Sequence, residues 1–355
     1  MPVAGGLSGQ DDRTQYEDQM SWDWSAETLA ALTAFLQQHG LYSGDPAPRR
    51  IGDGHSNLTY LINAGPAGVV LRRPPPPPIP KGANDVMREA RVMAALASSH
   101  LPVPGILATA EAGEVLDVPF YIMDHVTGAV ITGTLPAGFD AQTDGQAMAM
   151  EFADTLAHLH AVDWRAAGLE GFGNPQGFNA RHLARMEGLM QARKGPVPPE
   201  MQAMADWLRD QVPQETGGSI VHNDYRLGNL IWQPGSPPRL AAILDWELAT
   251  IGDPMLDLGY MAVCYPETDQ PLNPTQELSA AFLTPGFPPA EAIFERYAET
   301  SGRDVQGLGW FTVFQAWKLA VLYDYMHHKG TDAYYRDTTQ VPRFIAHAQR
   351  IAAGL

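Results

Sequence analysis

The 355-residue sequence has a single cysteine, Cys264, and few basic residues. One cysteine excludes an internal disulfide framework and a zinc site built from cysteines. The 23 lysines and arginines are outnumbered by 40 aspartates and glutamates, giving a net charge of −17. Because nucleic acids and anionic membranes select basic surfaces, we expect no partner of either kind.

Long apolar segments are also missing. The N-terminus lacks the basic start and apolar stretch of a signal peptide. The longest uncharged run, residues 92–110, is interrupted by Pro102 and Pro104, whereas a membrane span needs about 20 mostly apolar residues. With 45% hydrophobic residues the chain can still bury a sizeable core. These features predict a cytoplasmic globular protein and leave its oligomeric state open.

The pattern along the chain predicts a tail and two lobes. Residues 1–20 are polar and are expected to form a flexible tail. A helix is predicted to begin after the N-cap Ser25 and to end at Gly40. Strands are predicted over 58–63, 68–73 and 120–124, and a helix over 84–98. We therefore place an N-terminal lobe at 21–128 and a mainly helical C-terminal lobe at 129–355.

The strongest functional pattern lies between residues 221 and 257. It reads His-Asn-Asp-Tyr-Arg-Leu-Gly-Asn, followed by apolar segments at 230–232 and 240–244 with a Pro/Gly-rich turn between them. Such segments predict an antiparallel hairpin, which brings Asn229, before the first strand, beside Asp245, after the second. Two oxygen donors at one end of a hairpin suit Mg²⁺, which keeps its other positions for water and phosphates.

Asp224 lies five residues before Asn229, on the loop that leads into the same hairpin. A carboxylate that is near the metal without binding it can orient a substrate hydroxyl or accept its proton. Each of these residues alone also fits an ordinary loop, in which Asp and Asn are frequent caps. Their joint arrangement favours a phosphoryl-transfer site.

A turn before the first predicted strand carries Gly52, Gly54 and Ser56. Successive backbone N–H groups of such a turn can cradle phosphates. A glycine-rich hairpin turn without a ligand is the commoner explanation, and the turn alone does not decide between them.

Glu89 lies near the apolar face of the helix predicted over 84–98. A carboxylate directed at a core needs a cationic partner, and Arg72, on the strand predicted over 68–73, is the candidate. A salt bridge without function is the alternative. The face consists of Val86, Ala90, Met93 and Ala97.

Together these segments resemble the aminoglycoside phosphotransferase and choline kinase group, relatives of the protein kinases, over roughly residues 50–330. The resemblance implies an α+β, protein-kinase-like two-lobed fold. Its small N-terminal lobe is an antiparallel sheet with one key helix and binds nucleotide. Its larger, mainly helical C-terminal lobe holds the catalytic and acceptor sites.

The resemblance also implies roles for individual residues. Asp224 matches the catalytic base, and Arg226 the position facing the transferred phosphoryl group. His222 is expected to brace the loop and Asp257 to anchor it, with Asp253 as the other member of an acidic pair. The implied cofactors are ATP, bound by Gly52, Gly54, Ser56, Arg72, Glu89, Asp124, His125 and Val126, and Mg²⁺, bound by Asn229 and Asp245.

Arg72 is a departure from the family, which carries a lysine at this position. The planar guanidinium can still pair with phosphates through two hydrogen bonds. The departure leaves the choice between ATP and GTP open.

The segment Val-Leu-Arg-Arg-Pro-Pro, together with the segment Leu-Asp-Trp-Glu after the hairpin, is most similar to kinase-like domains associated with certain acyl-CoA dehydrogenases. This similarity implies a hydroxylated acceptor such as a hydroxyacyl-CoA. We expect an ATP- and Mg²⁺-dependent small-molecule O-phosphotransferase. The alternatives are a kinase for a cationic aminoglycoside or choline, a nucleotide-binding pseudoenzyme, and a metal-dependent hydrolase. Only eleven residues separate Asp245 from Asp257 and no Ala-Pro-Glu follows, which disfavours a protein substrate.

Other polar residues have simpler interpretations. His158 and His160 are two residues apart on a predicted helix and so cannot share a metal ion. Packed or solvated side chains are the favoured interpretation for both. Cys264 lies in an apolar run and is expected to be an unreactive buried thiol.

Overall fold

The computed structural model describes residues 24–41, 46–52, 56–63, 68–77, 84–267, 271–330 and 333–355. The predictions for residues 1–20 and for Gly54 lie outside these ranges. The chain divides into two compact units, the first formed by residues 1–94 and 104–125 and the second by 95–103 and 126–355. The division at 125 lies close to the predicted lobe boundary at 128, whereas residues 95–103, assigned by that prediction to the first lobe, group with the second unit.

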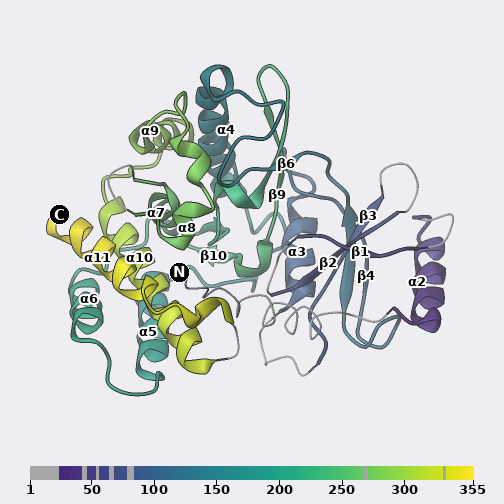
Figure 1. Ribbon diagram of the computed structural model, residues 1–355, viewed down its shortest axis with the longest axis horizontal. Helices are drawn as coiled ribbons and strands as arrows, with labels where there is room; N and C mark the ends of the chain where they lie inside the picture. The colour runs from purple at the N-terminus through teal and green to yellow at the C-terminus, as the bar shows by residue number, and fades with distance from the viewer. Residues whose placement is uncertain are drawn as a thin grey trace, which may run out of the picture. The chain divides into compact units, whose positions relative to one another are not determined.

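The first unit contains a five-stranded sheet in the order β1-β2-β3-β5-β4, in which every neighbouring pair is antiparallel. The strands predicted over 58–63, 68–73 and 120–124 are confirmed as β2, β3 and β5 (Figure 1). The elements of this unit are α2 (Ala26–Gln38), β1 (Arg49–Arg50), β2 (Leu58–Ile62), β3 (Val69–Arg73), α3 (Val86–Leu96, whose last two residues lie in the second unit), β4 (Ile106–Ala110) and β5 (Phe120–Asp124).

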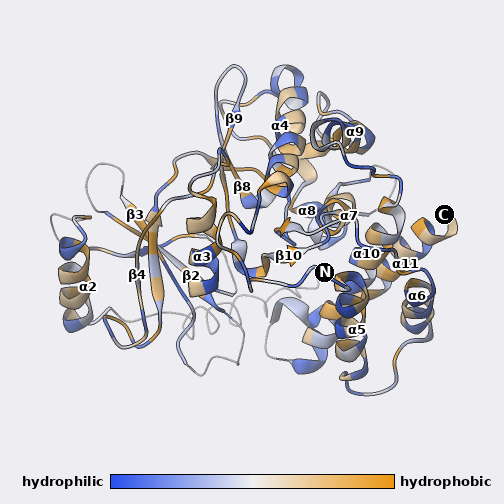
Figure 2. Ribbon diagram, turned by 180° about the vertical axis from the view of Figure 1, so that it is seen from behind, coloured by the Kyte–Doolittle hydropathy of each residue, from blue (hydrophilic) through white to orange (hydrophobic). Residues whose placement is uncertain are grey.

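Helix α2 forms where its caps and apolar spacing predict. The Ser25 hydroxyl accepts a hydrogen bond from the Thr28 backbone N–H at 3.1 Å, satisfying one free amide of the first turn. Leu32 and Leu36 are fully buried and pack against the sheet core. Figure 2 shows polar and apolar residues along the same helix. Gly40, with φ +69°, follows the helix in the left-handed conformation that glycine adopts without strain.

Helix α3 buries Val86, Ala90 and Met93, as predicted. The prediction that Ala97 completes the buried face was wrong, because Ala97 is exposed. The helix ends at Leu96, which is fully buried, so the residue after it leaves the helical face.

The second unit is mainly helical and is built around the long helix α10. Helices α5, α6, α7 and α11 pack on α10 (Figure 1), and most residues of α10 between Trp310 and Asp324 are buried. Among the described residues, none of the helices is long and apolar enough to cross a membrane. The helices are α4 (Ala141–Ala161), α5 (Phe178–Gln191), α6 (Pro199–Asp210), η1 (Leu227–Asn229), η2 (Trp246–Leu248), α7 (Met255–Cys264), α8 (Pro274–Glu277), η3 (Ala280–Leu283), α9 (Ala290–Ser301), α10 (Leu308–Lys329), η4 (Ala333–Arg336) and α11 (Gln340–Ala353).

The predicted hairpin is confirmed in the second unit. Strands β8 and β9 are antiparallel, Leu230 faces Ile243, and the Leu244 N–H donates to the Asn229 carbonyl at 2.8 Å. Strand β6 pairs with β8, and β7 with β10 in a separate two-stranded sheet. The strands are β6 (Ala129–Val130), β7 (Ser219–Val221), β8 (Leu230–Gln233), β9 (Arg239–Ile243) and β10 (Thr250–Gly252).

Candidate active site

The candidate catalytic loop connects β7 to the short helix η1 and contains Asp224. It turns at Asn223, whose φ of +66° is a left-handed conformation that asparagine tolerates better than most residues. The Asn223 side-chain amide donates to the Leu248 carbonyl at 2.9 Å. This bond ties the turn to the segment that follows the hairpin.

Asp224 receives a donor on each carboxylate oxygen. Arg226 Nε donates to Oδ1 at 3.2 Å, and Asn229 Nδ2 donates to Oδ2 at 2.7 Å. The Asp224 side chain nevertheless remains 17% exposed. The carboxylate is therefore held in a fixed direction and still has a face open to a small molecule.

His222 joins the catalytic loop to the end of β9. Its Nε2 donates to the Leu244 carbonyl at 2.8 Å, and its Nδ1 accepts from the Asp224 backbone N–H at 3.3 Å. Both bonds require the tautomer that carries the proton on Nε2. Since the ring connects residues on both sides of the hairpin, it braces the loop as predicted.

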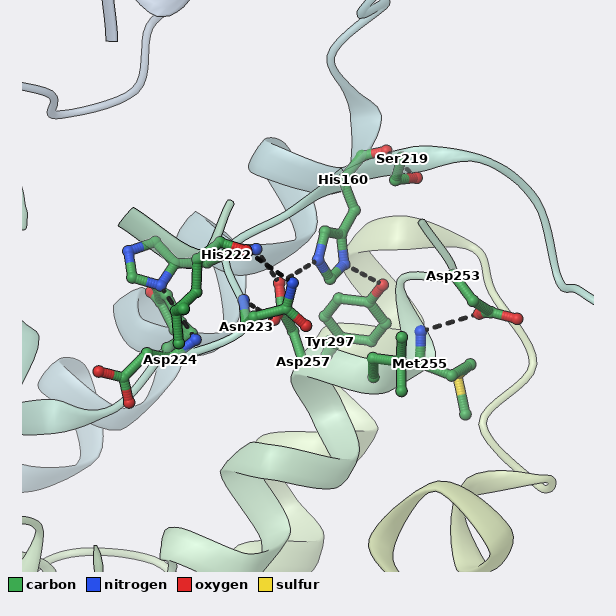
Figure 3. A network of polar contacts seen from close by, with 12 residues as sticks. His160, Ser219, His222, Asn223, Asp224, Asp253, Met255, Asp257 and Tyr297 are labelled. Carbon is green, nitrogen blue, oxygen red and sulfur yellow. Dashed lines mark hydrogen bonds and ion pairs between the residues drawn. The ribbon is translucent and has the colours of Figure 1, made fainter. Parts of the chain in front are cut away.

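Asp257, on α7, holds the same loop from the other side. Its carboxylate accepts from the backbone N–H groups of His222, at 2.7 Å, and Asn223, at 2.6 Å. His160 Nε2 donates to it at 3.1 Å. Figure 3 shows Asp257 at the centre of this network, with the Asp224 carboxylate turned away from it. Asp257 anchors the loop, as expected.

The contacts around Asp257 also fix its charge. The side chain is fully buried, which by itself would raise the pKa of Asp257. The His160 hydrogen bond and the His222 backbone N–H more than offset burial and hold the pKa of Asp257 below its usual value. His160 is packed, as the sequence favoured, and its Nδ1 lies 2.8 Å from the Tyr297 hydroxyl.

Asp253, the other member of the acidic pair, is also fully buried. Its carboxylate accepts from the Asn179 side chain at 3.0 Å, from the Thr216 backbone and hydroxyl at 3.0 and 2.6 Å, and from the Met255 N–H at 3.1 Å. With four donors around it, Asp253 connects α5, the segment before β7 and the start of α7.

Asn229 and Asp245 lie at the open end of the hairpin. Asn229 Nδ2 donates to both the backbone carbonyl and the side chain of Asp224, which leaves Oδ1 as the atom that can face a cation. Asp245 adopts φ +65° and ψ +61° at the turn into η2. In the described part of the chain, no cluster of three or more His, Cys, Asp or Glu side chains could hold a metal ion. The pair of oxygen donors fits Mg²⁺, which needs few protein ligands.

Arg226 is largely buried beside Asp224, with a side chain 15% exposed. Burial opposes its charge, but Asp224, and to a smaller extent other groups including Asp245, raise the pKa of Arg226 above its usual value. On α7, burial together with the charge of Asp224 raises the pKa of Tyr260. Neighbouring Cys264 is buried, and burial raises the pKa of its thiol to about 12, as expected of an unreactive thiol.

In the first unit, the predicted pair of Arg72 and Glu89 forms at 2.8 Å. Glu89 is 1% exposed and receives further hydrogen bonds from Asn57 Nδ2 at 2.5 Å and from the Tyr121 hydroxyl at 3.0 Å. Arg72 Nη1 also reaches the Thr59 hydroxyl at 3.3 Å. The carboxylate fixes Arg72 on β3, whose side chain stays 14% exposed.

The described part of the glycine-rich turn begins with Gly52 at φ +73°. Ser56 is held by Asn84, whose Nδ2 donates to the Ser56 carbonyl at 2.7 Å and to its hydroxyl at 3.0 Å. At the end of β5, the Asp124 N–H donates to the Gly105 carbonyl at 2.9 Å. The boundary between the two units falls between His125 and Val126.

Residues 47–293, more than half of the chain, match the family described as the phosphotransferase enzyme family. The chain belongs to this phosphotransferase enzyme family.

Curated relatives of this phosphotransferase carry the names of acyl-CoA dehydrogenases. Acyl-CoA dehydrogenase family member 11 from Pongo abelii is 31% identical over 308 residues, which cover 84% of this chain and 38% of that protein. Family member 10 from Mus musculus is 29% identical over 272 residues, 76% of this chain and 25% of that protein. Probable acyl-CoA dehydrogenase IBR3 from Arabidopsis thaliana is 32% identical over 295 residues, which cover 77% of this chain and 35% of that protein. The chain thus spans between a quarter and two fifths of the length of these relatives.

Solved structures confirm the kinase-like α+β fold of this phosphotransferase. A protein from Ralstonia eutropha assigned to the aminoglycoside phosphotransferases is 28% identical, with a TM-score of 0.76 over 92% of this chain and 98% of that one. The aminoglycoside phosphotransferase APH(4)-Ia, in a complex with AMP-PNP and hygromycin B, is 16% identical, with a TM-score of 0.60 over 91% of this chain and 98% of that one. A macrolide 2′-phosphotransferase type I is 18% identical, with a TM-score of 0.59 over 91% of this chain and 97% of that one. The last two show the fold alone.

Two residues around Glu89 were not found by sequence reasoning. Asn57 and Tyr121 both donate hydrogen bonds to its carboxylate. Asn57 follows the glycine-rich turn directly, and Tyr121 is the register partner of Arg72 on β5, so both signals were present in the sequence pattern.

Proposed function

We propose that the protein is an ATP- and Mg²⁺-dependent kinase that transfers the γ-phosphoryl group to a hydroxyl of a small molecule. One observation carries the proposal. The Asp224 carboxylate is fixed by Arg226 and Asn229 yet remains partly exposed, at the same end of the hairpin as Asp245. A purely structural aspartate, such as Asp257, has no exposed surface.

Asp224 would orient the acceptor hydroxyl and receive its proton. The acceptor oxygen forms a bond to the γ-phosphorus as the bond between this phosphorus and the β–γ bridging oxygen breaks. ADP leaves with the electron pair of the broken bond. Arg226, held against Asp224, supplies a fixed positive charge beside the oxygens of the group in transit.

In the first unit, Arg72 is the residue that would hold the nucleotide phosphates. Its Nε is engaged by Glu89. The Glu89 contact fixes the plane of the guanidinium, so less side-chain entropy is lost when a phosphate binds.

Asn229 Oδ1 and the Asp245 carboxylate are the donors that would hold Mg²⁺. The bound ion would neutralise charge on the nucleotide phosphates. The hydrogen bond from Asn229 Nδ2 to the Asp224 carboxylate orients the Asn229 amide. The proposed base, Asp224, and the proposed metal ligand, Asn229, are therefore positioned by the same hydrogen bond.

The acceptor that the relatives favour is a hydroxylated acyl compound, such as a hydroxyacyl-CoA. The three relatives described above, all named as acyl-CoA dehydrogenases, match over 76% or more of this chain. The alternative is a cationic acceptor of the aminoglycoside type, which rests on solved structures of similar fold.

The test measures thermal unfolding with ATP or GTP, each with and without Mg²⁺, followed by consumption of the γ-phosphoryl group with a panel of hydroxylated acceptors. A ligand that binds only the native state raises the unfolding midpoint. We expect a Mg²⁺-dependent rise in the wild type that Asp245→Ala abolishes. Asp210→Ala, at an exposed residue that ends α6, is the matched control and should keep the full rise.

Two outcomes contradict the proposal. No rise with either nucleotide at millimolar concentration would exclude a nucleotide site. A Mg²⁺-dependent rise without transfer to any acceptor would favour a nucleotide-binding protein that has lost catalysis.

A further inference from the structure

Asn84, which lies just before helix α3, has no part in the chemistry proposed so far. It adopts φ +58°, a left-handed conformation that asparagine and glycine tolerate better than other residues. Its Nδ2 donates to the Ser56 carbonyl at 2.7 Å, to the Ser56 hydroxyl at 3.0 Å and to Asn57 Oδ1 at 3.2 Å. The backbone conformation therefore directs one amide at the two residues that precede β2.

The start of α3 does not itself need the Asn84 amide. Asp85 Oδ1 accepts from the Arg88 N–H at 3.0 Å, and the Asp85 carbonyl accepts from the Glu89 N–H at 3.2 Å. Asp85 thus caps the helix in the usual way. The contacts of the Asn84 side chain serve the end of the glycine-rich turn instead.

Asn57 continues these contacts to the ion pair of the first unit. It is 2% exposed, and its Nδ2 donates to Glu89 Oε1 at 2.5 Å. The other carboxylate oxygen, Oε2, accepts from Arg72 Nε at 2.8 Å. A continuous series of hydrogen bonds therefore joins the end of the glycine-rich turn to Arg72, the residue that would hold the nucleotide phosphates.

The direction of each hydrogen bond in this series follows from the Glu89 carboxylate. An ionised carboxylate only accepts hydrogen bonds, so Asn57 presents its amide nitrogen to Glu89 and its oxygen to Asn84. Asn84 must then present its own amide nitrogen, which also donates to the Ser56 hydroxyl oxygen. Because that oxygen is already an acceptor, the hydroxyl hydrogen of Ser56 is directed elsewhere.

The Ser56 hydroxyl is thereby prepared to donate. Within the described ranges its oxygen makes no second hydrogen bond, and the residue is only partly buried. The oxygens of a phosphate group only accept, and a hydrogen bond to an ionised acceptor is stronger than one between neutral groups. A phosphate therefore suits the donor that this series of hydrogen bonds orients.

We propose that Asn84 is a positioning residue for the nucleotide phosphates. It orients the Ser56 hydroxyl as a donor to a phosphate oxygen and couples this donor to Arg72 through Asn57 and Glu89. The inference rests on the proposed function, since the phosphates are those of ATP. It concerns nucleotide binding alone and does not depend on the acceptor.

The test is a double-mutant cycle, in which calorimetric titration with ATP and Mg²⁺ is carried out on the full chain. Asn84→Gly removes the amide and keeps the left-handed backbone, and Ser56→Ala removes the hydroxyl. Each variant should weaken ATP binding by about tenfold, the effect of losing one hydrogen bond to a charged group. The double variant should be at most about twofold weaker than Ser56→Ala, whereas independent effects would multiply to about a hundredfold.

Ala94→Gly is the matched control on α3, at an exposed residue. It should lower the unfolding midpoint without nucleotide, because glycine is a poor helix former, and should bind ATP like the wild type. The control separates a loss of helix stability from a loss of phosphate positioning. Circular dichroism of each variant confirms that it is folded.

The inference is overturned if Asn84→Gly binds ATP as the wild type does, if the two effects multiply, or if Ala94→Gly weakens binding as much as Asn84→Gly. A wild type that binds no nucleotide rejects the inference together with the proposed function. A wild type that binds ATP with the expected pattern of variants, but phosphorylates no acceptor, keeps the inference and rejects the proposed transfer.

Discussion

Asp224 belongs to the candidate catalytic loop, and Asp257, on α7, accepts hydrogen bonds from the backbone of the same loop. Both carboxylates are engaged by several donors, but they differ in how much of the side chain remains exposed. Asp257 is fully buried, and its donors come from His160 and from the loop backbone. Asp224 is engaged by two side chains, Arg226 and Asn229, and keeps 17% of its surface. A carboxylate that only supports the fold is enclosed, whereas one that serves a substrate must be held and still be reachable.

The difference also lies in the kind of donor. Backbone N–H groups are fixed by the fold, so the charge of Asp257 is part of the stability of the loop. The donors to Asp224 are side chains that belong to the proposed site itself. Substitutions at the two positions should therefore separate stability from activity.

The largest effect is expected for Asp224→Asn. Loss of the proton acceptor should lower the rate of phosphoryl transfer by about a thousandfold, within the usual range for a general base. The Mg²⁺-dependent rise in unfolding midpoint with ATP should remain, because the proposed nucleotide and metal residues are unchanged. The checks are a transfer assay with the best acceptor and thermal unfolding with nucleotide. A variant that turns over like the wild type removes Asp224 from the mechanism.

In contrast to Asp224→Asn, Asp257→Ala should mainly lower the free energy of unfolding. It leaves His160 and two backbone N–H groups buried without their acceptor, which typically costs about 3–5 kcal/mol. This is a large part of a typical unfolding free energy of about 5–15 kcal/mol. Urea unfolding measures the loss, with Asp210→Ala as the exposed control. A loss below about 1 kcal/mol would contradict the anchoring role.

The contrast between the two aspartates was partly visible in the sequence. The spacing around Asp224, Asn229 and Asp245 predicted the hairpin, because apolar strand segments and a Pro/Gly turn act locally. The anchoring role of Asp257 came from a family resemblance. The donor that completes it, His160, lies 97 residues away, and no local pattern links the two.

In the first unit, too, local patterns predicted one contact, and partners from other elements were missed. Strand alternation and helix periodicity predicted the pairing of Arg72 with Glu89, because each residue occupies a definite face of its element. Asn57 and Tyr121 were not predicted as partners of Glu89. The position of Lys318 over the Tyr260 ring was also not predicted, since the two residues come from helices α10 and α7, whose packing the sequence does not specify.

Arg72 and Glu89 provide an intermediate case, since the carboxylate is enclosed and the guanidinium is 14% exposed. Arg72→Met should weaken ATP binding by about tenfold to a hundredfold, corresponding to the loss of a charge-assisted hydrogen bond. Arg72→Lys should recover much of the affinity, because it restores the ammonium found in the related kinases. Calorimetric titration with ATP and Mg²⁺ measures both variants. An unchanged affinity for Arg72→Met would exclude this side chain from the nucleotide site.

The smallest effect concerns acid unfolding. Because the pKa of Asp257 in the folded protein is below its usual value, its ionised form stabilises the fold. That contribution is fully present above the unfolded-state pKa of about 4 and is lost as pH falls through the lower folded-state pKa. The difference in unfolding free energy between wild type and Asp257→Asn should therefore be constant above about pH 5 and should shrink below pH 4. Urea unfolding at a series of pH values measures this difference. A difference that stays constant down to about pH 2 would mean that the donors around Asp257 hold its shape without depending on its charge.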